Sequence, residues 1–232
     1  MSPGPVTRGD GPHAGRRLVR AGAAPERARL ALVMMHGRGA SPEDMLGLAE
    51  HLAVPDVAIL APEAAGRSWW PDSFLAPLAD NEPGLSSALS VVDALTGDLA
   101  AEGFGPERTV VLGFSQGACL ALEHAARAGR RYHGVVGLSG GLVGTGEGNG
   151  PPSDALYGRA PKAFDYAGRL DGVPVLIGCH ERDPHIPLAR VRESGDVLRG
   201  MGADVTVEIH PGAGHGVVAE EITHLRGLLN RF

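Results

Sequence analysis

Apolar positions along this chain fall into two patterns, short continuous runs and longer stretches in which they recur every three or four residues. The short runs predict buried strands, and the longer stretches predict amphipathic helices. Strands are expected at residues 16–21, 30–35, 57–60, 109–113, 134–138, 173–178 and 205–210. Several runs, including 110–112, are apolar without interruption, which is typical of strands covered on both faces.

Helical stretches separate these strands. Ser41, followed by Pro42, Glu43 and Asp44, supplies the cap residue, first-turn proline and early acids of a helix start. Helices are expected at residues 42–52, 85–99, 116–128, 188–201 and 218–232. Apolar residues recur every three or four positions down to Phe232, so the chain should end on a packed helix.

The alternation of strands and helices predicts an α/β fold with a mostly parallel central sheet and helices on both faces. A single domain is expected over residues 15–232, preceded by a flexible segment, residues 1–14. Residues 140–172 are rich in glycine and proline, but expected strands lie on both sides of them. We therefore interpret residues 140–172 as an insertion or lid-side excursion and not as a linker between domains.

The composition narrows the class of protein. The chain has 232 residues, of which 43% are hydrophobic, so it can bury a sizeable core. Its 21 basic and 27 acidic residues give a net charge of −6, with no basic run, and nucleic acid is not an expected partner. Two cysteines, Cys119 and Cys179, fit a reducing compartment. The first 17 residues show neither a signal peptide nor a membrane span, so we expect a cytoplasmic protein.

Residues 109–118 carry the most specific motif. They comprise an apolar run, then G-x-S-x-G, then small residues that open a helix. Gly113 and Gly117 permit a sharp strand-to-helix turn, which would present Ser115 at the carboxyl edge of the sheet beside a helix N-terminus. A chance match in a glycine-rich chain is the alternative, and the flanking strand and helix argue against it.

A serine hydroxyl needs a base and an acid to become a nucleophile. Asp183 follows the expected strand 173–178, and His215 follows strand 205–210. The order Ser, Asp, His, with the last two on loops after successive late strands, is typical of α/β-hydrolases. Three other aspartates lie away from that carboxyl edge: Asp171, Asp196 and Asp204. His210 competes with His215, but the glycines around His215 make a loop that can reach the serine.

The oxyanion hole is expected from two backbone amides. One belongs to Gln116, directly after the serine, and the other to Arg38 in the Gly-rich loop that follows strand 30–35. His36 in the same loop is interpreted as a structural brace, because a histidine at a strand end before glycine usually holds its loop by hydrogen bonds.

Together, His36-Gly37-Arg38-Gly39, the G-F-S-Q-G run at 113–117, Asp183 before Pro184, and Gly214-His215 resemble the phospholipase/carboxylesterase family, which includes acyl-protein thioesterases and bacterial carboxylesterases. The resemblance extends from Arg29 to Phe232. It implies an α/β-hydrolase fold, a Ser115–His215–Asp183 triad without metal or cofactor, and carboxyl esters or thioesters as substrates. Because family members often dimerise, it also raises a homodimer as one expected assembly.

Residues 67–75 contain both tryptophans of the chain. Trp69, Trp70, Phe74 and Leu142 are predicted to line an acyl or alkyl pocket. The alternative is a small core that pins the loop, with one of the two tryptophans structural. The segment resembles bacterial esterases more than thioesterases of lipidated proteins. The charge of Arg38 at the pocket mouth suggests an acidic leaving group.

The chain is therefore predicted to be a serine carboxylesterase that hydrolyses short- to medium-chain esters of small molecules through an acyl-enzyme. An acyl thioesterase with the same triad is the alternative. A non-catalytic α/β-hydrolase scaffold that binds a small ligand or partner is the alternative of another class. A metal at His180, Asp183 and His185 is not expected, because their spacing fits no common zinc pattern.

Overall fold

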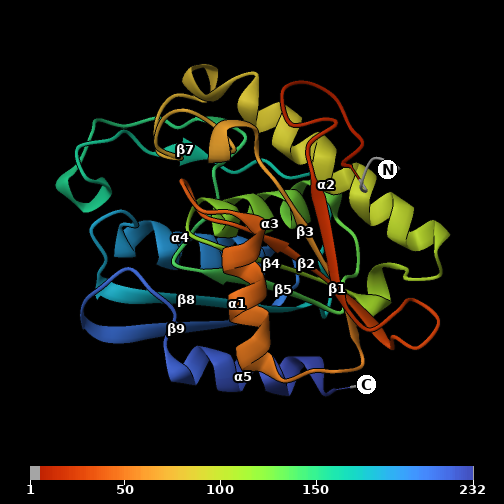
Figure 1. Cartoon of the computed structure of the whole chain (residues 1–232). Helices are drawn as coiled ribbons and strands as arrows, with labels where there is room; N and C mark the ends of the chain where they lie inside the picture. The colour runs from red at the N-terminus through yellow and green to blue at the C-terminus, as the bar shows by residue number, and fades with distance from the viewer. Residues whose placement is uncertain (1–5, 232) are drawn as a thin grey trace.

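The computed structural model describes residues 6–231, which form a seven-stranded sheet with helices on both faces (Figure 1). The strand order is β1-β3-β2-β4-β5-β8-β9; β1 runs antiparallel to β3, and every other neighbouring pair is parallel. The strands of the sheet are β1 (Leu18–Gly22), β2 (Leu30–Met35), β3 (Val57–Pro62), β4 (Thr109–Phe114), β5 (Gly134–Leu138), β8 (Pro174–Arg182) and β9 (Asp204–Ala213). The predicted α/β-hydrolase architecture is confirmed.

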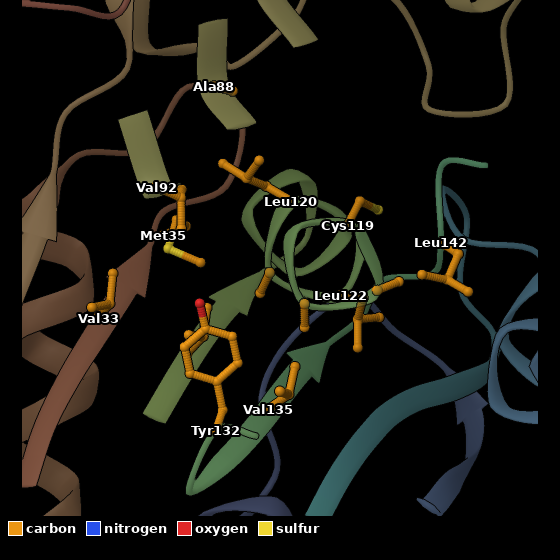
Figure 2. Packing of buried hydrophobic residues seen from close by; sticks show 14 of the residues in the cluster. Val33, Met35, Ala88, Val92, Cys119, Leu120, Leu122, Tyr132, Val135 and Leu142 are labelled. Carbon is orange, nitrogen blue, oxygen red and sulfur yellow. The ribbon is translucent and has the colours of Figure 1, made fainter. Parts of the chain in front are cut away.

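The helices divide between the two faces as the strand pattern requires. The long helices are α1 (Pro42–Leu52), α2 (Gly84–Ala101), α3 (Gln116–Ala128), α4 (Leu188–Gly200) and α5 (Ala219–Leu229). In β2, Leu32 and Met34 face the core under α1 and α5, while Val33 and Met35 face the core under α2, α3 and α4. Figure 2 shows this second core, where Leu120 and Leu122 of α3 lie over the sheet. Burial on both faces explains why the central strands are continuously apolar.

β8 and β9 extend several residues beyond their predicted ends. Their pairing continues through a bulge between His180 and Arg182 and reaches Ala213. The polar side chains at these ends interrupt the apolar run that marks a buried strand in the sequence. Backbone pairing does not require apolar side chains, so the two strands carry their following loops further out from the core.

The sequence predicts a flexible segment over residues 1–14. Residues 1–5 lie outside the described part of the chain, but residues 6–14 pack on the domain. Thr7 and His13 are buried, and the His13 amide donates to Ser87 Oγ of α2 at 3.0 Å. The Ser87 hydroxyl in turn donates to the carbonyl of Asp10. Polar contacts hold this segment, and a search for apolar periodicity does not detect them.

Residues 140–172 leave the sheet after β5 and return to it at β8. They contain a two-stranded antiparallel hairpin of β6 (Gly146–Glu147) and β7 (Lys162–Ala163), and a short 3-10 helix at Asp154–Leu156. The segment is an excursion from one sheet. No helix within residues 6–231 has both the length and the apolar character needed to cross a membrane.

The stability of the fold should fall in mild acid because of a buried histidine on α3. Burial lowers the pKa of His124 to about 4, and its Nε2 lies 2.8 Å from the Tyr132 hydroxyl. Because the unfolded chain binds this proton near pH 6.5 and the folded protein does not, stability falls as pH drops from 6.5 toward 4. At pH 5 this group alone should reduce the free energy of unfolding by about 2 kcal/mol.

Urea unfolding at pH 7 and pH 5 tests this prediction. His124→Gln should show a smaller loss of stability between the two pH values than the wild type. His51→Gln, the same change at an exposed histidine of α1, should leave the loss unchanged. An equal loss in wild type and His124→Gln would contradict the assignment.

Candidate active site

Ser115 occupies a sharp turn between β4 and α3. Its backbone has φ 54° and ψ −118°, a conformation that a serine adopts only when the surrounding structure imposes it. A Cβ atom at Gly113 would lie 2.0 Å from the Gly117 carbonyl oxygen, and one at Gly117 would lie 2.1 Å from the Met35 carbonyl oxygen. Both glycines are therefore required by close backbone approach, as the motif predicts.

Three side chains from distant parts of the chain meet at this turn. His215 Nε2 lies 2.8 Å from Ser115 Oγ, and His215 Nδ1 lies 2.7 Å from Asp183 Oδ2. Asp183 comes from the loop after β8, and His215 from the loop after β9. Both distances are within hydrogen-bond range, so the three predicted residues have the geometry of a nucleophile, a base and an orienting acid.

Three residues that the sequence offered as alternatives to Asp183 and His215 contact other residues. Asp171 pairs with Arg169 at 2.6 Å on the exposed surface. Asp196 pairs with Arg199 within α4 at 2.9 Å. His210 Nε2 lies 3.3 Å from Glu221 Oε1.

The Asp183 carboxylate is held by several donors. Its Oδ1 accepts the amides of His185 at 2.8 Å and Ile186 at 3.1 Å, and its Oδ2 lies 3.7 Å from Cys179 Sγ. Burial raises the pKa of Asp183, but the hydrogen bonds from His215 and the His185 amide outweigh burial and hold the pKa below its ordinary value. The acid therefore stays ionised at neutral pH, as an orienting carboxylate must.

Cys179 and Tyr157 also contact Asp183. The sequence did not identify them as neighbours of this acid. Burial and the neighbouring Asp183 charge raise the pKa of the Cys179 thiol. The thiol thus stays protonated and can donate to the carboxylate. The Tyr157 hydroxyl, from the 140–172 excursion, donates to the Asp183 carbonyl.

The two residues predicted to supply oxyanion-hole amides lie beside Ser115. The Gln116 amide is the first of α3 and has no acceptor within the helix. The loop with Arg38 lies against Ser115, since a Cβ at Gly37 would be 3.3 Å from the Ser115 Cβ. Arg38 and Gln116 both line the cavity at Ser115. This is the arrangement expected of an oxyanion hole.

The Gln116 side chain fixes the loop that carries the two tryptophans. Its Oε1 accepts the Trp69 amide at 2.9 Å, and its Nε2 donates to the Trp70 carbonyl at 2.8 Å. His36 braces the neighbouring loop as expected. Its Nε2 accepts the Ala64 amide at 3.1 Å, so Nδ1 carries the proton and donates to the Gly37 carbonyl. Burial lowers the pKa of His36, which keeps it neutral.

A cavity of about 520 Å³ opens beside Ser115 and His215. Its buried apolar lining consists of Trp70, Phe74, Cys119 and Ile186. Its exposed side consists of Arg38, Pro71, Asp72 and His185. Such a cavity can hold a small apolar group next to Ser115, with polar groups near solvent.

Two predicted pocket residues, Trp69 and Leu142, lie outside this cavity. Trp69 is fully buried in the core, where its Nε1 donates to the His36 carbonyl at 2.8 Å and its ring contacts those of His13 and His36. Leu142 is fully buried, and its amide donates to Ser194 Oγ of α4 at 2.8 Å. Of the adjacent residues Trp69 and Trp70, only Trp70 lines the cavity.

Besides Pro71, Asp72 and Ser73, which flank predicted pocket residues, three further residues of the cavity did not emerge as pocket residues from the sequence. His185 and Ile186 follow Asp183 closely, so the turn that positions the acid also brings them to the cavity. The His185 ring lies 4.8 Å from the His215 ring, edge to face. Cys119 lies one helical turn after Ser115, on the same side of α3. Their spacing from the triad is the signal that could have identified them.

The Arg38 side chain forms hydrogen bonds with main-chain carbonyls at the edge of the cavity. Its guanidinium donates to the carbonyls of Pro71 and Asp72, which belong to the cavity wall. Arg38 thus joins the loop after β2 to that wall. Within residues 6–231, no group of three His, Cys, Asp or Glu side chains is arranged to hold a metal ion.

Known proteins share sequence and fold with this chain. The family model described as phospholipase/carboxylesterase matches residues 18–231. A protein of Gibberella zeae named acyl-protein thioesterase 1 is 32% identical over 129 residues, which are 56% of this chain and 50% of that protein. This chain thus spans half the length of that relative. Lysophospholipase-like protein 1 of Mus musculus is 24% identical over 213 residues, 84% of this chain and 83% of that one.

A solved structure extends the likeness over nearly the whole chain. The crystal structure of a phospholipase/carboxylesterase from Dyadobacter fermentans superposes with a TM-score of 0.82 at 34% sequence identity. The superposition covers 96% of this chain and 99% of that one.

Proposed function

Because this chain belongs to the phospholipase/carboxylesterase family, we propose that it is a serine carboxylesterase that hydrolyses short- to medium-chain esters of small molecules. The family supports hydrolase activity, and the finer assignment rests on one observation. Ser115 Oγ, both His215 ring nitrogens and Asp183 Oδ2 form a hydrogen-bonded line with distances of 2.8 and 2.7 Å, beside a cavity.

The proposed reaction proceeds in two halves. In the first, Ser115 Oγ attacks the ester carbonyl carbon while His215 Nε2 takes the hydroxyl proton. The negative charge on the carbonyl oxygen is held by the amides of Arg38 and Gln116, and Asp183 stabilises the imidazolium. The bond to the alcohol oxygen then breaks, and His215 returns the proton to that oxygen. The alcohol leaves, and the acyl group stays on Ser115.

The second half restores the enzyme. A water molecule gives a proton to His215 Nε2 and attacks the acyl carbon. The tetrahedral intermediate collapses, the bond to Ser115 Oγ breaks, and His215 returns the proton to that oxygen. The carboxylic acid is released. No cofactor takes part in these steps.

The size of the acyl group follows from the cavity. A space of about 520 Å³ walled by Trp70, Phe74 and Ile186 suits a short to medium acyl chain. A thioesterase is the second candidate, because the same residues would cleave a thioester and a relative carries the name acyl-protein thioesterase 1. A non-catalytic scaffold would have no need for the full hydrogen-bonded line.

Labelling with a fluorophosphonate probe tests the proposal. The wild-type protein should take up one probe per chain, and mass spectrometry of the digested protein should locate it on Ser115. p-Nitrophenyl esters of increasing acyl length, assayed beside acyl-CoA thioesters, then separate the two candidates. Faster turnover of the thioesters would favour the thioesterase. A protein that takes up no probe and cleaves neither class would contradict both.

A further inference from the structure

The chain contains a single lysine, Lys162, among its 21 basic residues. Its side chain is fully buried in the β6–β7 hairpin, whereas most of the arginines lie wholly or partly at the surface. A slender stem with a compact ammonium can be buried where the broader, planar guanidinium cannot replace it. A buried ammonium needs carbonyl or carboxylate acceptors, and those of Lys162 belong to two different segments.

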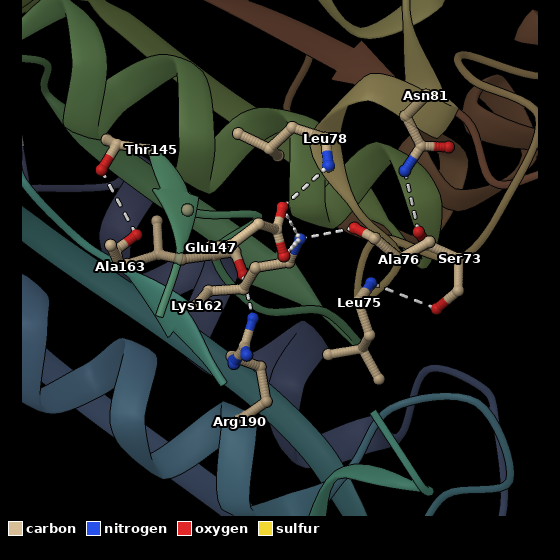
Figure 3. A network of polar contacts seen from close by, with 12 residues as sticks. Ser73, Leu75, Ala76, Leu78, Asn81, Thr145, Glu147, Lys162, Ala163 and Arg190 are labelled. Atoms are coloured by element: carbon tan, nitrogen blue, oxygen red, sulfur yellow. Dashed lines mark hydrogen bonds and ion pairs between the residues drawn. The ribbon is translucent and has the colours of Figure 1, made fainter. Parts of the chain in front are cut away.

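Lys162 joins the hairpin to the segment that forms the cavity wall (Figure 3). Its Nζ donates to the Ala76 carbonyl at 2.5 Å and to the two carboxylate oxygens of Glu147 at 2.8 and 3.0 Å. Glu147 Oε1 also accepts the Leu78 amide at 3.0 Å. The pair of charged residues therefore holds the main chain on both sides of Pro77.

The held segment carries part of the active-site cavity. Ser73 and Phe74 line the cavity, and only Leu75 separates them from the first clamped residue, Ala76. The other end of the segment is fixed by buried Asn81, whose Nδ2 donates to the Ser73 carbonyl at 2.8 Å and whose Oδ1 accepts the Asp72 amide at 2.9 Å. The wall is thus a short arch of chain held at both ends, with Lys162 at one of them.

The hairpin itself is anchored to the helix of the nucleophile. Glu123 of α3, two turns after Ser115, accepts the amides of Val143 and Gly144 at 2.9 and 3.1 Å and the Tyr166 hydroxyl at 2.7 Å. These contacts fix both arms of the excursion, before β6 and after β7. Lys162 and the hairpin therefore fix the wall relative to α3, the helix that follows Ser115.

We propose that Lys162 is a specificity-determining positioning residue, which holds the Ser73–Phe74 wall through Ala76 and Glu147 and so limits the acyl length that the cavity accepts. This inference rests on the proposed esterase function. Without the ammonium, the buried Ala76 carbonyl loses its partner, and half-exposed Glu147 can turn toward water. The Ser73–Phe74 segment would then move and let the cavity accept a longer acyl chain.

Two variants and a matched control test this role. Lys162→Met keeps the length of the side chain and removes the charge, and Glu147→Gln keeps an acceptor for the Leu78 amide. Arg20→Met is the control, since it removes an ion pair with Glu102 that joins β1 to the region after α2, outside the cavity. For each protein, kcat/KM per fluorophosphonate-reactive site is measured with p-nitrophenyl butyrate and p-nitrophenyl octanoate.

The expected change is in the ratio of the two esters. One or two methylenes in an apolar pocket change kcat/KM by roughly tenfold or more, so Lys162→Met should raise the octanoate-to-butyrate ratio about tenfold. Glu147→Gln should shift it in the same direction by less, and Arg20→Met should leave it unchanged. Acrylamide quenching of tryptophan fluorescence should also increase in Lys162→Met, because Trp70, one of the two tryptophans of the chain, lines the cavity together with Ser73 and Phe74.

A purely structural role predicts a different result. A lower melting temperature with an unchanged ester ratio and unchanged quenching would overturn the proposal. If Lys162→Met does not fold, the ratio in Glu147→Gln decides. If wild type neither reacts with the probe nor cleaves esters, the proposed function has failed, and quenching alone then supports or refutes the clamp.

Discussion

Ser115→Ala is expected to lower kcat for ester hydrolysis by about 10⁵-fold or more and to abolish fluorophosphonate labelling. The hydroxyl is the only group of the proposed triad that forms a bond to the substrate, so no neighbouring residue can replace it. Stability should change by less than about 1 kcal/mol, since Ser115 is partly exposed and alanine tolerates the turn as well as serine does.

Ser139→Ala provides a matched control. Ser139 follows β5, the strand next to β4, and also has a positive φ, of 52°. Its buried hydroxyl has no hydrogen-bond partner among residues 6–231. The same substitution there should leave both the labelling and the hydrolysis intact. Comparable loss in the two variants would show that the change acts through the backbone and not through the nucleophile.

Persistent labelling of Ser115→Ala would assign the chemistry to another nucleophile. The nearest alternative is Cys119, which also lines the cavity. Burial raises the pKa of this thiol to about 12, so the reactive thiolate is rare at neutral pH. Labelling that persists in Ser115→Ala and disappears in Cys119→Ala would therefore contradict both the proposed nucleophile and this account of the thiol.

The fold was accessible from the sequence because burial on both faces leaves a strong pattern. Strands such as 30–35 and helices such as 42–52 have the same limits in the structure as in the prediction. The pattern fails where main-chain or polar contacts replace apolar burial. The ends of β8 and β9 continue beyond their apolar runs, and residues 6–14 are held by hydrogen bonds to α2.

The candidate triad was accessible for a different reason. The turn at Ser115 requires glycine on both sides, and this requirement is local in sequence. The cavity wall follows no such local rule. Trp69 and Trp70 are adjacent, but only Trp70 lines the cavity, and the contacts that hold Trp69 come from His13, His36 and Gln116 in three other segments. Sequence spacing alone does not bring these segments together.

Asp183→Asn is expected to lower kcat by about 10⁴-fold while the protein remains folded. Asparagine can keep its oxygen toward the amides of His185 and Ile186, which in the wild type donate to Asp183 Oδ1. Its NH₂ group then faces His215 Nδ1, which must become an acceptor. The imidazole proton moves to Nε2, and that nitrogen can no longer take the proton of Ser115.

The position of the proton thus separates an orienting role from a structural one. The melting temperature of Asp183→Asn should stay near that of wild type, whereas labelling by the fluorophosphonate should slow with kcat, because both reactions need the same activated serine. Asp171→Asn makes the same change in an exposed ion pair with Arg169 and should affect neither rate. Activity in Asp183→Asn within tenfold of wild type would show that the carboxylate does not set the tautomer of His215, and the proposed mechanism would then lose its orienting acid.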